Sequence, residues 1–269
     1  MVDAVLHVVR CFEDADVVHV DGKIDPISDI ETIDTELVLA DLESMERQQE
    51  RLVKKARGND KEAIERLAVY EPAHVLLAEG TSLRAGDWSV EQLHHLRSGG
   101  FITIKPVLYV CNVDEAGAVS GNNFSEIVAA RAQSEGAGCV VISGQIEAEL
   151  SEMDPEDRGD FLADMGLDAP GLNKLARASY DLLGLQTYFT AGEKEIRAWT
   201  IPVGATGPQA AGVIHTDFEK GFIRAQVYGL SDLQTHKTEA ALKAAGRLRS
   251  EGKEYVVQDG DIMHFLFNV

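Results

Sequence analysis

The sequence contains few of the residues that would cross-link the chain or hold it in a membrane. Its 269 residues include three cysteines, Cys11, Cys111 and Cys139. They are far apart and set in apolar runs, so buried thiols are expected rather than a disulfide framework or a zinc site. No apolar run approaches the roughly 18 to 20 residues that cross a bilayer, and the N-terminus lacks the basic start of a signal peptide. A soluble, cytoplasmic protein with no membrane partner is predicted.

Basic side chains are also scarce. The chain has 25 Lys and Arg against 45 Asp and Glu, a net charge of −20 at pH 7, which opposes any diffuse attraction to nucleic acid. Residues 185–269 carry nine basic and ten acidic side chains, so residues 1–184, with 16 basic and 35 acidic, hold −19 of that charge. Any contact with nucleic acid is therefore expected in the C-terminal third.

The sequence also lacks the pattern of a phosphate-binding loop. The pattern G-x-x-x-x-G-K-[ST], in which backbone amides and a lysine surround nucleotide phosphates, does not occur in the sequence. No Ser-His-Asp arrangement with its flanking signatures is identifiable either. We therefore predict no catalytic residue and no metal ligand within these residues.

Three short apolar stretches have the composition of buried parallel strands, at residues 4–12, 106–111 and 139–143. Residues 124–135, with apolar side chains at helical spacing, join the last two and predict a βαβ unit.

The segment between the first two strands is helical in pattern. Residues 30–57 predict a long amphipathic helix, and residues 61–70 a returning helix that Pro72 should kink or end. Ser89 with Gln92 indicates the capped start of a third helix. A projecting helical arm is favoured over an ordinary two-helix packing layer.

The pattern changes near Gly184. Short strands are predicted at residues 185–191, 195–202, 222–228, 254–258 and 262–269, with one helix at 239–251. This is typical of a small α+β domain.

Polar residues follow the second and third predicted strands. Asn112, Val113 and Glu115 come after one strand, and Ser143 and Gly144 end the next. Ligands of open α/β sheets bind at the carboxyl ends of strands, so these loops should face a common crevice. The amide of Asn112 suits the N6/N7 edge of adenine, and Glu115 can accept an N–H. A turn closed by an Asx hydrogen bond is the alternative interpretation.

Aromatic, basic and hydroxyl groups occur together at residues 214–225. Lys220 and Arg224 could contact the phosphates of RNA while an aromatic ring stacks on a base. The alternative is that Phe218, Phe222 and Ile223 belong to the hydrophobic core.

Several stretches resemble the YchF, or Obg-like, ATPase family. They are HVVRCFED at 7–14, ETIDTELVLADLE at 31–43, residues 185–225 and EGKEYVVQDGDIMHFLFNV at 251–269. The resemblance covers essentially the whole chain. Asn112-Val113-Asp114-Glu115 stands where this family has Asn-x-x-Glu in place of the guanine-recognising Asn-Lys-x-Asp, a change that the family associates with ATP. The resemblance therefore favours base binding, with Val113 packing on the base, over the simple turn.

The resemblance implies three structural parts. Residues 1–29 and 101–183 would form the C-terminal part of an Obg-type G domain, a P-loop NTPase parallel sheet. Residues 30–100 would be a coiled-coil insertion, and residues 184–269 a TGS domain of β-grasp type.

It also implies a function. The family protein would be a ribosome-associated regulator that binds ATP and hydrolyses it to ADP and phosphate, and that contacts the ribosome or its RNA through the TGS domain and the arm. Family members begin with a further segment that carries the phosphate loop and the ligands of Mg²⁺. These residues alone are therefore expected to be inactive, with Mg²⁺ bound only when that segment is present. The competing prediction is a non-enzymatic RNA or ribosome adaptor.

Overall fold

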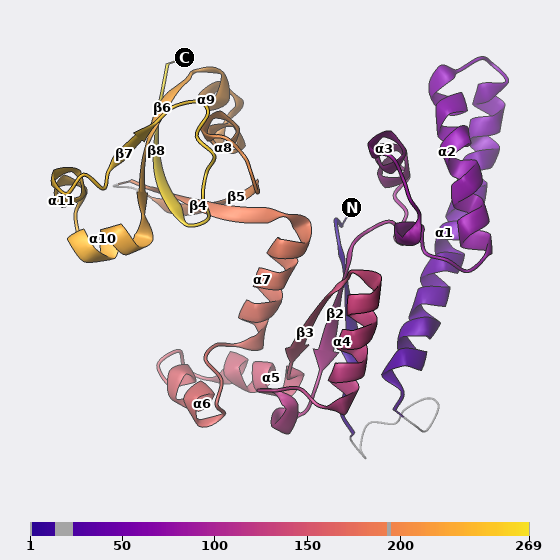
Figure 1. Cartoon of the computed structure of the whole chain (residues 1–269), viewed down its shortest axis with the longest axis horizontal. Helices are drawn as coiled ribbons and strands as arrows, with labels where there is room; N and C mark the ends of the chain where they lie inside the picture. The colour runs from indigo at the N-terminus through magenta and orange to yellow at the C-terminus, as the bar shows by residue number, and fades with distance from the viewer. Residues whose placement is uncertain (1, 14–23, 193–194, 269) are drawn as a thin grey trace. The chain divides into compact units, whose positions relative to one another are not determined.

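The computed structural model describes residues 2–13, 24–192 and 195–268 and separates into two units, Met1–Leu183 and Gly184–Val269 (Figure 1). Two predicted stretches extend beyond the described residues: residues 7–14 by residue 14, and the strand predicted at 262–269 by residue 269. One sheet has three strands in the order β1-β2-β3, and the other has five in the order β5-β4-β8-β6-β7. The predicted mixed α/β class with a parallel sheet is confirmed.

The first unit is built on the parallel sheet. Its strands are β1 (Val5–Arg10), β2 (Val107–Asn112) and β3 (Gly138–Ile142). All pairings are parallel, and the prediction of a βαβ unit is confirmed because α4 (Asn123–Glu135) joins β2 to β3. Residues further along form a short 3₁₀ turn and three helices: η2 (Glu115–Gly117), α5 (Gly144–Glu152), α6 (Arg158–Asp164) and α7 (Gly171–Leu183).

The cysteines lie in or beside this sheet. Cys11 and Cys111 are fully buried, Cys139 is partly buried, and the sulfur atoms of Cys111 and Cys139 are 3.6 Å apart. A hydrogen bond to Cys11 is the main reason why the pKa of Cys111 rises to about 12. The prediction of buried thiols is confirmed for Cys11 and Cys111, and Cys111 stays protonated near neutral pH.

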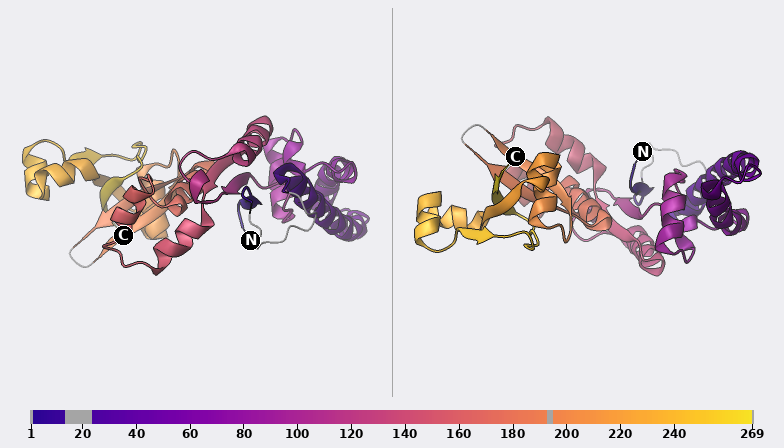
Figure 2. Two further views of the ribbon diagram at one scale, coloured as in Figure 1. Left: turned by 90° about the horizontal axis from the view of Figure 1, so that it is seen from below. Right: turned by 90° about the horizontal axis from the view of Figure 1, so that it is seen from above.

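Helices between β1 and β2 form an antiparallel pair with a smaller helix beside it. The elements are α1 (Pro26–Ala56), α2 (Lys61–Ala78), η1 (Leu83–Ala85) and α3 (Val90–Ser98). Figures 1 and 2 show α1 and α2 side by side. Ser89 and Gln92 form the predicted capping box at the start of α3.

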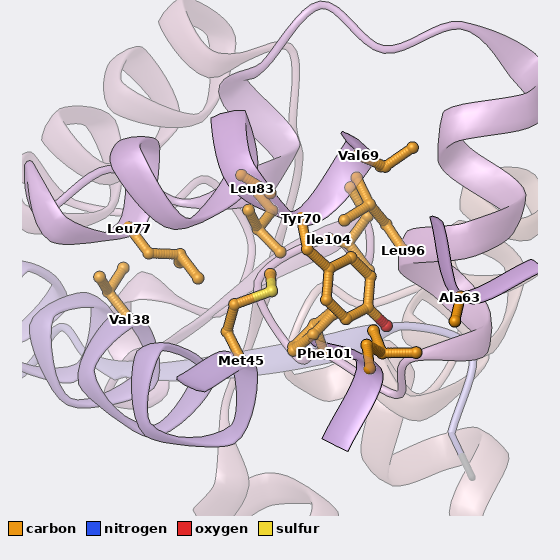
Figure 3. Close-up of a cluster of buried hydrophobic side chains, with 12 residues drawn as sticks. Val38, Met45, Ala63, Val69, Tyr70, Leu77, Leu83, Leu96, Phe101 and Ile104 are labelled. Atoms are coloured by element: carbon orange, nitrogen blue, oxygen red, sulfur yellow. The ribbon is translucent and has the colours of Figure 1, made fainter. Parts of the chain in front are cut away.

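The helices have a hydrophobic core separate from that of the sheet. Figure 3 shows Met45 of α1 and Tyr70 of α2 pointing into the space between the two helices, and the ring of Tyr70 meets Phe101 edge to face, with centroids 5.4 Å apart. This cluster draws on α1, α2, α3 and the loop before β2, so the helices pack on one another, while Ile30 near the start of α1 belongs to the core of the sheet.

Pro72 was predicted to kink or end the second helix, and the structure shows that it does not end it. α2 continues to Ala78. Proline removes one backbone hydrogen bond, but Tyr70, Ala73 and Leu77 are each at most 1% exposed and bury the same face of the helix on both sides of it. Packing against α1 therefore outweighs the local preference.

A buried carboxylate ties the long helix to the loop that leads into β2. Asp41 of α1 is 3% exposed and accepts hydrogen bonds from the amide of Ile102 at 2.8 Å and from the amide and hydroxyl of Thr103 at 2.6 and 2.7 Å. Thr103 in turn accepts from the amide of Leu83 and from Nε of Arg84. Asp41 thus joins α1 to the loop before β2, and Thr103 of that loop joins it in turn to η1.

The second unit contains an antiparallel sheet with one parallel contact, between β4 and β8. Its strands are β4 (Leu185–Ala191), β5 (Ile196–Pro202), β6 (Phe222–Gly229), β7 (Arg249–Glu251) and β8 (Asp261–Phe267). Its helices are α8 (Gly207–Ile214), α9 (Thr216–Lys220), α10 (Leu230–His236) and α11 (Glu239–Ala244). None of the helices in the described parts of the chain is both long and apolar enough to span a bilayer.

Two sequence predictions for this unit are wrong. The helix expected at 239–251 stops at Ala244, and the strand expected at 254–258 is replaced by a single bridge between Val256 and Thr206. Gly246, at φ +69°, follows the helix end, and Arg249–Glu251 then pairs with β6. Hydrogen bonding to β6 therefore makes Arg249–Glu251 the strand β7, although this segment is shorter and less apolar than residues 254–258.

Asp41→Ala should lower the free energy of unfolding by about 3 kcal/mol, because it leaves the buried amides of Ile102 and Thr103 without their acceptor. Urea unfolding followed by circular dichroism would measure this. Glu36→Ala, at an exposed position of the same helix, is the control and should change it by less than about 0.5 kcal/mol. Equal effects of the two substitutions would contradict the anchoring role.

Candidate functional site

The ends of β2 and β3 meet at one edge of the parallel sheet. Asn112 is in register with Ile142, and the amide of Val113 donates to the carbonyl of Ile142 at 2.9 Å. Oδ1 of Asn112 accepts a hydrogen bond from the backbone amide of Gly144 at 2.8 Å. The structure therefore joins the two loops through a direct contact between Asn112 and Gly144.

This contact caps helix α5. Ser143 occupies the N-cap position but makes no side-chain capping bond, so Asn112 supplies an oxygen from the neighbouring strand to the first amide of the helix. A Cβ on Gly144 would lie 3.2 Å from Oδ1 of Asn112, and glycine permits the close approach. Among the described residues, Nδ2 of Asn112 has no hydrogen-bond partner, so the amide keeps a donor for a ligand.

Glu115 opens the 3₁₀ turn η2, which the carboxylate of Asp114 caps at the amide of Gly117. Oε1 of Glu115 accepts from Nε2 of Gln145 at 2.8 Å, and the same nitrogen lies 3.4 Å from Oε1 of Glu149. Gln145 was not predicted as a site residue. The only hint in the sequence is its place directly after Gly144, in the first turn of the helix that follows the second loop.

Two predicted residues have buried side chains. Val113 is 2% exposed and belongs to the sheet core. Its amide continues the β-ladder, so its side chain points into the protein. The expected packing of the Val113 side chain on a base is therefore not available in this structure.

Ser143 is 3% exposed, and its hydroxyl has no partner among the described residues. Ser143, Ile146 and Glu147 line a small space of about 10 Å³, about the size that one water molecule needs. Asn112, Glu115 and Gln145 are among the polar side chains that remain accessible at this edge of the sheet.

The second predicted contact surface lies on the other unit. Lys220 ends α9, Arg224 lies on β6, and both are exposed. Neither has an ion-pair partner among the described residues. Phe222 is buried in the core, as the alternative held, whereas Ile223 is 56% exposed. The ring of Phe218 stacks on that of Phe267 of β8, with centroids 3.7 Å apart, and Phe218 packs against the hydrophobic core, again as the alternative held.

A charged cleft of about 710 Å³ in the first unit was not predicted. It lies between α1, η1 and α4. Arg131 of α4 contacts Glu135 and lies 3.5 Å from Glu31 and 3.9 Å from Asp34 of α1. Burial raises the pKa of Asp34. Because these side chains pair across the cleft, we interpret the cleft as the place where ion pairs hold α1 against α4.

Comparison with known proteins finds relatives that match almost the whole length of this chain. The family model described as YchF-GTPase_C, a protein of unknown function (DUF933), matches residues 185–268. The chain is 52% identical over 267 residues to the ribosome-binding ATPase YchF of Escherichia coli O157:H7, a match covering 99% of this chain and 73% of that protein. It is 45% identical over 270 residues to the protein of the same name from Bacillus subtilis (strain 168), which covers 100% and 74%. The structure of the Schizosaccharomyces pombe YchF GTPase matches with a TM-score of 0.79 at 37% identity, over 98% of this chain and 72% of that one.

Asn112→Ala should lower the free energy of unfolding by about 1 kcal/mol, because helix α5 loses the acceptor of its first amide. Amide hydrogen exchange should show faster exchange at Gly144 than in the unsubstituted chain. Asn173→Ala, an exposed position near the start of α7, serves as the control. Unchanged protection of the Gly144 amide in Asn112→Ala would show that the side chain does not cap α5.

Proposed function

Because this chain belongs to the YchF family, we propose that it is an ATP-binding, ribosome-associated regulatory protein whose adenine-binding surface includes Asn112 and Glu115. The observation that carries the proposal is the 52% identity over 99% of the chain to a protein named ribosome-binding ATPase. The geometry adds a physical reason, since accessible hydrogen-bonding groups gather where ligands of parallel sheets bind.

The two side chains would have separate roles toward the base. Nδ2 of Asn112 is a donor, which suits the ring-nitrogen acceptor N7 of a purine. The carboxylate of Glu115 is an acceptor and suits the amino group of adenine. Gly144 would contribute by keeping the backbone of α5 close to Asn112, and Ser143 through its backbone, because its side chain is buried.

Hydrolysis of ATP to ADP and phosphate requires groups around the β and γ phosphates. The sequence lacks the phosphate-loop pattern, and no group of three or more His, Cys, Asp or Glu among the described residues could hold a metal ion. The described residues therefore offer no preformed cluster for Mg²⁺, an ion that proteins usually bind through one or two carboxylates together with the phosphates of a nucleotide. We propose that they supply base binding, that they do not turn over ATP by themselves, and that Mg²⁺ and the reaction belong with a phosphate-binding segment.

We propose that residues 184–269 form a β-grasp TGS domain and contact ribosomal RNA in the cytoplasm, together with the helical arm at residues 30–100. Lys220 and Arg224 are exposed cations on the unit whose charge is nearly balanced. They can approach phosphates without the repulsion that the acidic first unit would create. A non-enzymatic ribosome adaptor remains the second candidate, favoured by the lack of the phosphate-loop pattern.

The full chain should bind ATP, and Asn112→Ala or Glu115→Ala should weaken that binding about tenfold, the effect of one lost hydrogen bond to a base. Amide chemical shifts during an ATP titration would measure the affinity. Glu156→Ala, an exposed acidic position outside the site, should bind as the unsubstituted chain does. Normal ATP binding by both site variants would refute the proposed surface.

Changing Lys220 and Arg224 together to Glu should reduce co-sedimentation of the chain with ribosomes at least tenfold, because two phosphate contacts become repulsive. Lys174→Glu with Arg177→Glu gives the same charge change at exposed positions of α7 in the other unit, outside the helical arm, and is the matched control. Retained binding by the first variant would remove this surface from the proposal. If binding does not respond to ATP, the adaptor function is the better description.

A further inference from the structure

We propose that Gln145 determines which purine this site accepts, by occupying one carboxylate oxygen of Glu115 and so disfavouring guanine. The inference rests on the proposed nucleotide function and concerns a residue that the sequence did not single out.

The geometry fixes how the Gln145 amide is oriented. Its nitrogen lies 2.8 Å from Oε1 of Glu115 and 3.4 Å from Oε1 of Glu149. An amide oxygen in that position would face two carboxylates and be repelled, whereas an N–H group can donate to them. Glu149 lies one turn after Gln145 on α5, so it supports this orientation from the same helix.

The occupied oxygen matters because the two purines present different edges. Guanine carries an N1–H and an amino group side by side, which a carboxylate recognises best with both oxygens free. With Oε1 of Glu115 already accepting from Gln145, the second donor of guanine must compete for it. Adenine has a single amino donor on its corresponding edge, and the other oxygen of Glu115 is sufficient for it.

Asn112 cannot provide this selection. Its Oδ1 is engaged by the amide of Gly144, and its remaining donor suits N7, which adenine and guanine share. Val113 is buried and cannot select either. Discrimination between the two bases therefore falls to the pair formed by Glu115 and Gln145.

The test uses the full chain and compares AMP with GMP, because both bring the base without requiring a site for three phosphates. Amide chemical shifts give the two dissociation constants. We expect the unsubstituted chain to prefer AMP. Gln145→Ala should tighten GMP binding about tenfold, the effect of one hydrogen bond to a charged group, while AMP binding changes less than about twofold.

Two further variants separate this role from a general disturbance. Gln145→Lys keeps a donor for Glu115 and should keep the preference for AMP. Glu149→Ala removes only the 3.4 Å contact and should also keep it. An unsubstituted chain that prefers AMP and a Gln145→Ala variant with the same ratio would overturn the role of Gln145 alone. An unsubstituted chain whose spectrum responds to neither nucleotide would overturn the proposed base-binding surface, and this inference with it.

Discussion

Parallel pairing of β2 with β3 is the constraint on which the candidate site depends. It places Asn112 in register with Ile142, so that the residues after both strands emerge at one edge. The hydrogen bond from Gly144 to Asn112 then starts α5 at a fixed position, and that start places Gln145 beside Glu115. A shift of the register by one residue would turn Asn112 to the other face of the sheet and separate all of these groups.

The same hydrogen bond bears on the question that the sequence left open about Asn112. The sequence offered a turn closed by an Asx hydrogen bond or a base-binding role, and in the structure Oδ1 of Asn112 instead accepts from the amide of Gly144 at the start of α5. An amide has a donor and an acceptor on different atoms, so one can stabilise the helix while the other remains available. Capping and ligand binding are therefore compatible at this residue, and the capping bond holds the donor in place.

Buried and partly buried charges organise the rest of the first unit. Asp41 binds the loop before β2 to α1, and Arg131 holds the start of α1 against α4. Both contacts fix the long helix at points close to the sheet, while its hydrophobic core with α2 and α3 is self-contained. This unit carries nearly all of the net negative charge, which is why the proposed RNA contact involves exposed cations of the other unit.

Features that depend on neighbouring residues could be predicted from the sequence: the apolar strands β1, β2 and β3, the long helix α1, and the capping box of Ser89 and Gln92. The sequence also located Asn112 and Glu115, because polar residues directly after buried strands have a predictable place. Tertiary structure decided that α2 continues through Pro72, that Arg249–Glu251 became β7, that Val113 is buried and that Gln145 reaches Glu115. In each of these cases the residue or segment that determines the outcome lies far away in the chain. Local propensity contributes only tenths of a kcal/mol to about 1 kcal/mol per residue for most residue types, and it carries no information about such a distant partner.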